Sequence, residues 1–257
     1  VPESRDPEAT GTPDVPGLIT LSASMSLLVI ALFRGNDEGW GSALIVSMLA
    51  SSVVLMAAFI AIESRVARPL LDLNLFRNPA TIGASVAILL IAIAVFSQLT
   101  YLVFWIQNLL QYDALETGLR LLPLTVATFF AGAATARLAE RVPLRILISG
   151  GLALAGVGLL LAHGVEVDSE WTAFLAGGIV IGLGTGLINP SVAAAALGAA
   201  PVRQSGMASG VNSTFRILGV AIGVAALGAI MESEVSSALA SSLGNAPAGL
   251  VDVASTG

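Results

Sequence analysis

The side chain best suited to chemistry in this sequence is Arg216, which lies well inside an apolar segment. A guanidinium at that depth costs roughly 2.5–3.5 kcal/mol on membrane-insertion scales, so it should face protein or a watery cavity. Asn212, Gly219 and Gly223 share its helical face. Two interpretations stay open: Arg216 contacts an anion or carboxylate in a transport pathway, or it is structural and binds helix-end carbonyls or extends to the membrane surface.

A second group of polar side chains lies on another apolar segment, where Gln98, Tyr101 and Trp105 recur at i, i+3 and i+7. They share one helical face, which suits a cavity for an amphipathic organic molecule. Tyr101 and Trp105 also fit an interfacial aromatic belt.

Asn189-Pro190 is predicted to interrupt a further apolar segment, because proline removes a helical donor. Asn189 is therefore either a binding group at a helix break or a neighbour of a simple kink.

Composition excludes most other chemistry. The 257 residues are 56% hydrophobic and 11% charged, whereas soluble domains carry about 25% charged residues. Cys and Lys are absent and His163 is the single histidine, which excludes disulfides, multi-histidine metal sites and lysine Schiff bases. No Ser/His/Asp cluster or pair of carboxylates is evident. We expect no metal, no cofactor and no enzymatic activity, and the net charge of −6 argues against a nucleic-acid partner.

The apolar residues fall into seven stretches, each near the roughly 20 residues that cross a bilayer as a helix. We therefore expect an all-α integral membrane protein with about seven transmembrane helices. A polar linker is expected at 1–16, and a tail at 232–257 that is either solvated or holds a short interfacial helix. The expected spans are 17–34, 41–62, 82–107, 119–136, 146–162, 172–197 and 207–231.

The distribution of arginine predicts the orientation of these helices. Arginines follow the second, fourth and sixth stretches, whereas the loops after the third and fifth stretches hold acids and no arginine. This alternation places the N-terminal linker in the cytoplasm and the C-terminal tail outside, in a multi-pass protein of the inner cell membrane.

Glycines at four-residue spacing predict close helix contacts, because small residues let helix backbones approach each other in lipid. We expect several tightly packed helices rather than separate rods. The expected contact stripes are Gly178/Gly182/Gly186, Gly206/Gly210 and Gly219/Gly223.

The loop at 136–145, Ala-Arg-Leu-Ala-Glu-Arg-Val-Pro-Leu-Arg, resembles the signature loop of the major facilitator superfamily, roughly Gly-x-Leu-Ala-Asp-Arg-x-Gly-x-Arg. Stretches 73–78, 118–123 and 205–219 resemble landmarks of one branch, the 14-span drug:proton antiporters of the EmrB/QacA type. The resemblance implies a major-facilitator-type helix bundle. It also implies a conformational latch in the cytoplasmic loop, formed by Arg137, Glu140, Arg141 and Arg145.

The resemblance implies a domain organisation as well. Residues 17–80 correspond to the extra central helix pair with its cytoplasmic loop, and 81–231 to part of the C-terminal half. The Gly-Pro antiporter motif of the family is absent from this sequence and belongs to the N-terminal half. The implied partners are therefore that missing N-terminal half, the lipid bilayer and a small amphipathic organic substrate, with the proton gradient as energy source.

We expect this chain to be the C-terminal part of a proton-coupled multidrug or small-molecule exporter, with substrate near the midplane between two halves. The alternative is a truncated, non-transporting membrane protein, either a scaffold or a non-functional fragment. Substrate identity does not follow from the sequence. The candidate substrate-cavity residues are Gln98, Tyr101, Trp105, Asn189, Asn212 and Arg216.

Overall fold

The computed structural model describes residues 14–66, 69–162, 171–199 and 205–244, with side chains as far as Glu234. The described part of the chain is helical and contains no strand. Seven of its helices are long and apolar enough to cross a membrane, which confirms the predicted fold class. Most of the expected 1–16 linker, His163 and the end of the 232–257 tail lie outside the described residues.

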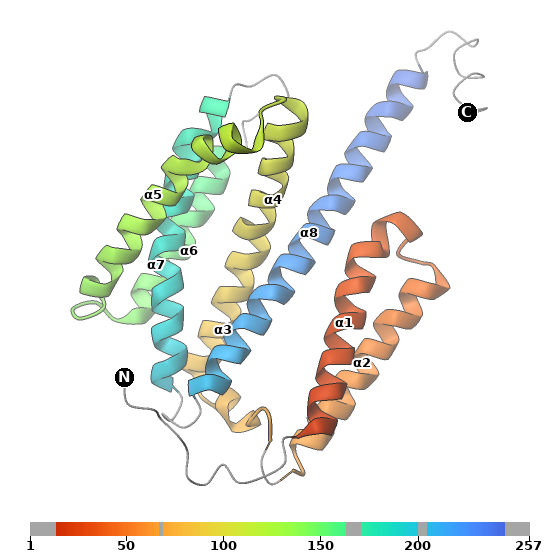
Figure 1. Ribbon diagram of the computed structural model, residues 1–257, viewed down its shortest axis with the longest axis vertical. Coiled ribbons are helices and arrows are strands. Elements are labelled where there is room, and N and C mark those ends of the chain that lie inside the picture. The colour runs from red at the N-terminus through yellow and green to blue at the C-terminus, as the bar shows by residue number, and fades with distance from the viewer. Residues whose placement is uncertain (1–13, 67–68, 163–170, 200–204, 245–257) are drawn as a thin grey trace.

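The first two crossings form a hairpin that stands beside the other helices (Figure 1). α1 (Val15–Glu38) and α2 (Ala43–Glu63) are joined by a turn in which Gly39 adopts a positive φ of 82°. In the hairpin interface the buried Ser24 hydroxyl donates to the Ser52 carbonyl at 2.8 Å, and the Ser52 hydroxyl donates to the Ser24 carbonyl at 2.9 Å. Reciprocal bonds of this kind hold helices together in lipid, where the hydrophobic effect does not.

The third crossing is a long helix that changes its winding twice. After the short helix η1 (Leu73–Arg77) it comprises α3 (Pro79–Ile91), the π-helical turn η2 (Ala92–Phe96), α4 (Ser97–Phe104) and a second π-helical turn, η3 (Trp105–Leu109). Turns of this type inside α-helices are rare and frequent at functional sites. The sequence predicted the crossing at 82–107 but not these two turns.

The remaining crossings complete a five-membered bundle (Figure 1). They are α5 (Ala114–Leu138), α6 (Leu144–Ala162), α7 (Leu175–Ala199), which is preceded by the short helix η4 (Trp171–Phe174), and α8 (Ser205–Gly244). α7 packs against α3, α5 and α6, whereas α8 packs against α3, α4 and the α1 helix of the hairpin. α7 is thus the centre of the bundle, and α8 joins the bundle to the hairpin.

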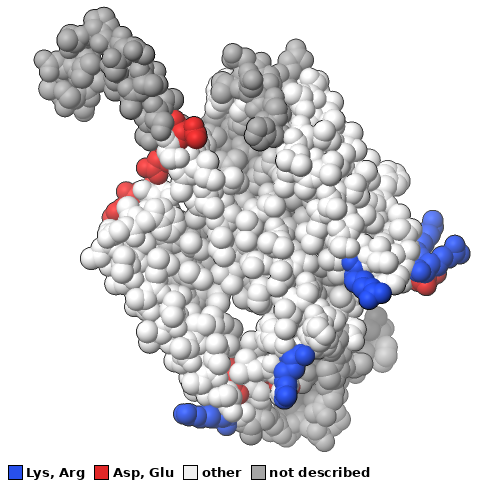
Figure 2. All heavy atoms as spheres, turned by 180° about the vertical axis from the view of Figure 1, so that it is seen from behind, with Lys and Arg blue, Asp and Glu red and all other residues white. Residues whose placement is uncertain are grey.

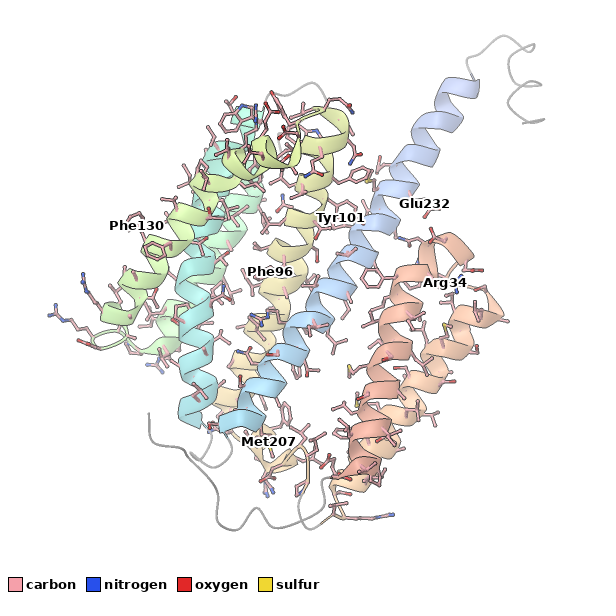
Figure 3. All side chains as sticks on the ribbon, in the orientation of Figure 1. Arg34, Phe96, Tyr101, Phe130, Met207 and Glu232 are labelled. Carbon is pink, nitrogen blue, oxygen red and sulfur yellow. The ribbon has the colours of Figure 1, made fainter. Side chains whose placement is uncertain are left out.

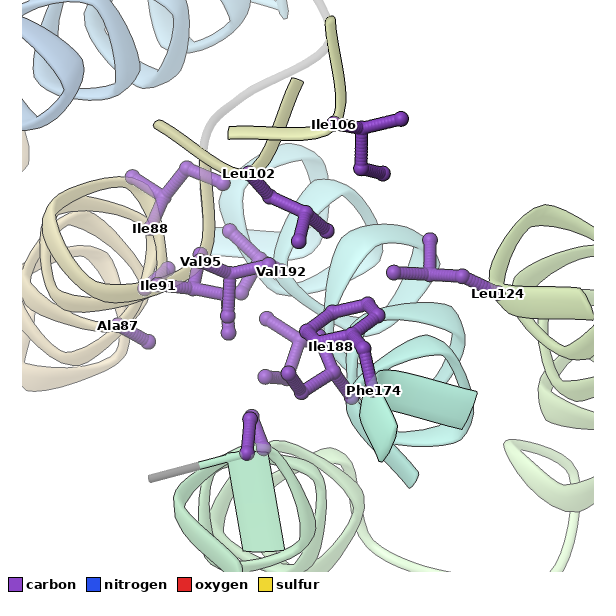
Figure 4. Packing of buried hydrophobic residues seen from close by; sticks show 14 residues of the cluster. Ala87, Ile88, Ile91, Val95, Leu102, Ile106, Leu124, Phe174, Ile188 and Val192 are labelled. Carbon is purple, nitrogen blue, oxygen red and sulfur yellow. The ribbon is translucent and has the colours of Figure 1, made fainter. Parts of the chain in front are cut away.

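A continuous apolar core lies between α3 and α7. Ile91 and Val95 on the third crossing and Ile188 and Val192 on α7 are at most 1% exposed. Figure 4 shows Ile91, Val95 and Val192 in contact range at the centre of the cluster, with Leu124 approaching from α5. Dense van der Waals contact is the main attraction available to helices inside a bilayer.

Glycines on α7 let two neighbours approach on different faces. A Cβ built on Gly184 would lie 2.6 Å from the Gly151 carbonyl oxygen of α6, and one on Gly186 would lie 2.6 Å from the Ala131 Cβ of α5. Gly182 also packs against α5, as the predicted stripe requires, but Gly178 meets only Phe174. Close packing through glycine is therefore confirmed, although the contacts use two faces instead of one stripe.

The two glycine pairs predicted on the last crossing have different outcomes. A Cβ on Gly219 would lie 2.6 Å from the Leu89 carbonyl oxygen, and one on Gly223 would collide with the Ile93 carbonyl. A Cβ on Gly206 or Gly210 would meet nothing within 4 Å. Gly219/Gly223 therefore forms a helix contact, whereas no described residue packs closely against Gly206 or Gly210.

Pro190 does not interrupt α7, which corrects the prediction of a break at Asn189-Pro190. The helix runs from Leu175 to Ala199. Proline lacks the N–H that would bind the carbonyl four residues earlier, here that of Gly186. The buried Thr135 hydroxyl of α5 lies 3.2 Å from this carbonyl and 2.7 Å from the Ala131 carbonyl of its own helix, so its single proton is shared between the two acceptors. A neighbouring helix thus supplies a replacement donor, which lets α7 continue.

Two helix ends differ from the predicted spans. α5 begins at Ala114, not 119, because Asp113 and Glu116 form a capping box in which the Glu116 N–H donates to the Asp113 Oδ1 at 2.7 Å. α8 continues to Gly244 instead of ending near 231. Glu232, Ser233 and Glu234 end the apolar run but do not break a helix. The first part of the 232–257 tail is therefore a helical extension of the last crossing.

Candidate functional site

Of the predicted site residues on the third crossing, Tyr101 contacts α8, as does the neighbouring Ser97. The Ser97 hydroxyl donates to the Val220 carbonyl at 3.1 Å, and the Tyr101 hydroxyl donates to the Val224 carbonyl at 2.8 Å. Figure 3 shows Tyr101 directed from α4 toward α8. Tyr101 therefore links two helices through its hydroxyl group, a contact that the sequence did not predict.

Trp105 and Asn189 lie elsewhere in the bundle. Trp105 is the first residue of η3 and packs, partly buried, against the apolar core. Asn189 is a partly exposed residue of α7, directly before Pro190. Tyr101 and Trp105, predicted to share one helical face, thus contact different neighbours.

Gln98 and Asn212 each carry a buried amide oxygen, Oε1 and Oδ1 respectively, that has no hydrogen-bond partner among the described residues. A buried acceptor without a donor is unfavourable by about 1–3 kcal/mol, so each of these oxygens lacks a stabilising donor among the described residues. They lie at different depths. Ser97, beside Gln98, contacts Val220, which is eight residues or about 12 Å along α8 from Asn212.

Arg216 is exposed on α8, one helical turn after Asn212. Within the described part of the chain its guanidinium forms no ion pair or hydrogen bond. The helix around it is apolar, since an 18-residue stretch within Ser205–Glu234 has a mean hydropathy of 1.9. The structure therefore leaves an arginine uncovered on a helix that is suited to lie in hydrocarbon.

The loop predicted as a conformational latch connects α5 and α6. It turns through bonds from the Arg141 and Val142 N–H groups to the Leu138 carbonyl, at 2.9 and 2.8 Å. No residue of this loop has a positive φ, so alanine and proline can replace the glycines of the family pattern. The four predicted latch residues, Arg137, Glu140, Arg141 and Arg145, are all exposed.

Several arginines gather toward one end of the long axis of the molecule, and several acidic residues toward the other. Figure 2 shows arginine side chains toward the lower end and a group of acidic side chains near the upper end. The lower end contains η1 with Arg77 and the α5–α6 loop, and the upper end contains Glu232 and Glu234 of α8. In the described part of the chain, the arginines after the second and fourth predicted stretches thus lie toward one end, while the acidic loop after the fifth stretch lies outside the described residues.

Arg120 forms an aromatic contact that the sequence did not predict. Its guanidinium carbon lies 3.4 Å from the Tyr112 ring centroid and 5.7 Å from that of Trp171. Arg120 also donates to the Glu116 carbonyl at 3.0 Å. These contacts hold its charge at the acidic end of α5 by cation–π attraction.

A pair of carboxylates, which sequence spacing did not reveal, lies where α1 begins and α2 ends. A Cβ built on Gly17 would lie 2.9 Å from the Glu63 Oε1 and would collide with the Asp14 Oδ2. Both oxygens are buried and have no hydrogen-bond partner among the described residues. The two acids are 49 positions apart in the sequence, and the hairpin brings them together.

The helix bundle and its charge distribution define a multi-pass membrane protein. The Major Facilitator Superfamily pattern matches residues 15–224, and the chain belongs to this family of membrane transporters.

Several curated relatives carry names that refer to drug resistance or export. The chain is 30% identical over 226 residues to the multidrug resistance protein Stp of Mycobacterium tuberculosis, covering 88% of this chain and 42% of that protein. It is 31% identical over 244 residues to the puromycin resistance protein pur8 of Streptomyces alboniger, covering 93% and 48%. It is 29% identical to the tetracenomycin C resistance and export protein of Streptomyces glaucescens, covering 91% and 43%. The chain spans less than half the length of these relatives.

Proposed function

We propose that this chain is the C-terminal portion of a 14-span, proton-coupled exporter of small amphipathic organic molecules in the inner membrane. α1 and α2 are the extra central pair, and the five crossings from α3 to α8 are part of the second half. The names of relatives about twice as long, which refer to multidrug resistance and to export, support this assignment.

The observation that carries the proposal is the uncovered Arg216. An arginine inside the apolar part of a transmembrane helix faces protein or water, because hydrocarbon solvates it poorly. The described residues provide no partner for it. A second helical half placed against this face of α8 would cover the guanidinium and enclose a cavity, as alternating access requires.

Within that cavity, Gln98 and Asn212 would accept hydrogen bonds from a substrate, and Arg216 would contact an anionic group on a substrate or on the other half. The buried amide oxygens without donors support these roles. Asn189, Tyr101 and Trp105 are proposed as weaker contributors, since Tyr101 and Trp105 already have neighbours inside this chain. The proton gradient would drive export, and the exposed latch loop would contact helix ends of the other half on the cytoplasmic side.

The first test is the mass of the native gene product, detected in membranes through a C-terminal epitope. A species well above the 26.0 kDa of this chain supports the proposal. A product of that mass that neither pairs with another half nor exports contradicts it, and would identify a truncated, non-transporting protein.

The second test is export of a fluorescent amphipathic substrate by the complete gene product carrying Arg216→Ala. We expect export to fall by about tenfold or more at equal expression, because a hydrogen bond to a charged group contributes about 1.5–3 kcal/mol. Arg34→Ala is the matched control, since Arg34 is exposed and pairs only with Glu38 on its own helix, at 3.1 Å. Unchanged export by Arg216→Ala would remove this residue from the mechanism.

A further inference from the structure

A large apolar cavity separates the α1/α2 hairpin from α8. Its volume is about 710 Å³, within the range of roughly 300–1,000 Å³ typical of small-molecule sites. The hairpin touches α8 above the cavity, where the Asn36 amide approaches the Ala225 carbonyl at 3.4 Å. At the lower end of the cavity, the segment after α2 contacts α8, where the Asp72 N–H lies 3.0 Å from the sulfur of the lining residue Met207. The cavity therefore lies between a hairpin–α8 contact at one end and this loop–α8 contact at the other.

The cavity lining is suited to aromatic and irregular apolar groups. Thr214 is the only residue with a polar side chain among those that line it, and its hydroxyl donates to the Gly210 carbonyl of its own helix at 3.0 Å. Methionines adapt to ligands of different shape and contact aromatic rings favourably. Figure 3 shows Met207 at the start of α8, close to the lower end of the hairpin. Aromatic and methionine side chains of the lining are Met25, Met56, Phe59, Phe76, Met207 and Phe215.

The carboxylate pair of Asp14 and Glu63 does not line this cavity, but lies about one helical turn beyond the lining residues at its lower end. Glu63 follows the lining residue Phe59 by one helical turn on α2, and Gly17, which both carboxylates approach, precedes the lining residue Leu21 by one turn on α1. Glu63 is only 4% exposed. The Leu71 N–H donates to its Oε2 at 3.2 Å, while Oε1 has no partner among the described residues.

We propose that the cavity between α1, α2 and α8 binds a lipophilic organic cation, with its apolar groups in the cavity and its charge toward Asp14 and Glu63. A cation offsets the repulsion between two close carboxylates and pairs with a buried acid whose desolvation is otherwise uncompensated. An anionic or neutral ligand would neither offset this repulsion nor pair with the buried acid. The residues that would form the site all belong to this chain, so binding can be measured without the proposed export function.

The test is equilibrium binding of tetraphenylphosphonium to the purified 257-residue chain in lipid nanodiscs, with empty nanodiscs subtracted. Tetraphenylborate, which has the same shape and the opposite charge, serves as the comparison ligand. We expect saturable binding of the cation and at least a tenfold preference over the anion. Glu63→Gln should lower cation affinity by about tenfold, since one pair of opposite charges is lost, while glutamine can still accept the Leu71 N–H.

Two further variants test whether binding depends on this cavity and its carboxylates, and not on the overall charge of the protein. Glu234→Gln removes one charge from an exposed position on α8 and should leave binding unchanged. Gly210→Leu fills the cavity without a clash at its Cβ, which would meet nothing within 4 Å, and should abolish saturable binding. All variants are first compared by thermal unfolding. Equal cation affinity in wild type and Glu63→Gln, or unchanged binding in Gly210→Leu, would overturn the proposal. Because binding is measured without transport, a failure of export does not affect this result.

Discussion

The hydroxyl of Thr135 shows how a single side chain allows proline inside a transmembrane helix. Pro190 leaves the Gly186 carbonyl without its helical donor, and in hydrocarbon no water can replace that donor. The Thr135 side chain, 1% exposed on the neighbouring α5, places its hydroxyl 3.2 Å from the Gly186 carbonyl, within hydrogen-bond distance. The identity of residue 135 is therefore coupled to that of residue 190, although 55 positions separate them.

A double-mutant cycle tests this coupling. Thr135→Val keeps the shape of the side chain and removes the donor, and we expect it to lower the free energy of unfolding by about 0.6–1.7 kcal/mol, the range of hydrogen bonds between transmembrane helices. In a Pro190→Ala background, where the helix supplies its own N–H, the same change should cost much less. Denaturation in mixed micelles measures both. Equal costs in the two backgrounds would show that Thr135 does not compensate for Pro190.

At the scale of elements, α7 determines how closely its neighbours pack. Its glycines face α5 on one side and α6 on the other, so three helix backbones come together around one axis. The core residues of α7, Ile188 and Val192, then reach the third crossing on a further face. A larger residue at a glycine position would move a whole helix and not only a neighbouring side chain.

Substitution of Gly184 tests this arrangement. A Cβ at Gly184 would lie 2.6 Å from the Gly151 carbonyl and the Ala155 nitrogen of α6, both rigid backbone atoms. We expect Gly184→Ala to lower the free energy of unfolding by about 1–3 kcal/mol through overpacking. Gly150→Ala is the matched control, because a Cβ there meets nothing within 4 Å and alanine favours a helix. Thermal unfolding in detergent compares the two, and equal midpoints would contradict the close approach.

Sequence patterns predicted the elements well, and their contacts less well. Runs of apolar residues identified all seven crossings because length and hydropathy alone decide whether a helix spans a bilayer. The π-helical turns at Ala92–Phe96 and Trp105–Leu109 had no local signal, since ordinary apolar residues form them. Of the proposed site residues, the sequence located Gln98 and Asn212 on helical faces. It could not show that their oxygens lack donors, or that Asp14 meets Glu63, because both depend on how distant helices pack.

For the whole molecule, the gathering of arginine toward one end bears on membrane orientation. The arginine-rich end contains η1 and the α5–α6 loop, and short loops with excess arginine remain in the cytoplasm. We therefore propose that this end faces the cytoplasm and that the turn between α1 and α2 faces outward. The absence of cysteine from the sequence makes the proposal directly testable by labelling.

Single cysteines at the two ends of α2 provide the test. Gly41→Cys lies in the α1–α2 turn, where a Cβ meets nothing within 4 Å, and Ser64→Cys lies exposed just after α2. We expect a membrane-impermeant maleimide to label position 41 in intact cells and position 64 only after permeabilisation. The parent chain without cysteine is the control for background labelling. The reverse pattern would show that the orientation is wrong.

The length of α8 has a mechanical consequence. Its 40 residues extend about 60 Å, twice the roughly 30 Å hydrocarbon thickness of a bilayer, and Figure 1 shows its upper end projecting past the other helices. The contacts at Val224 and Ala225 lie about 28 Å from Gly244, so a tilt of about 10° there would displace the far end by about 5 Å. A small rearrangement of α8 inside the membrane would therefore become a larger movement at the membrane surface.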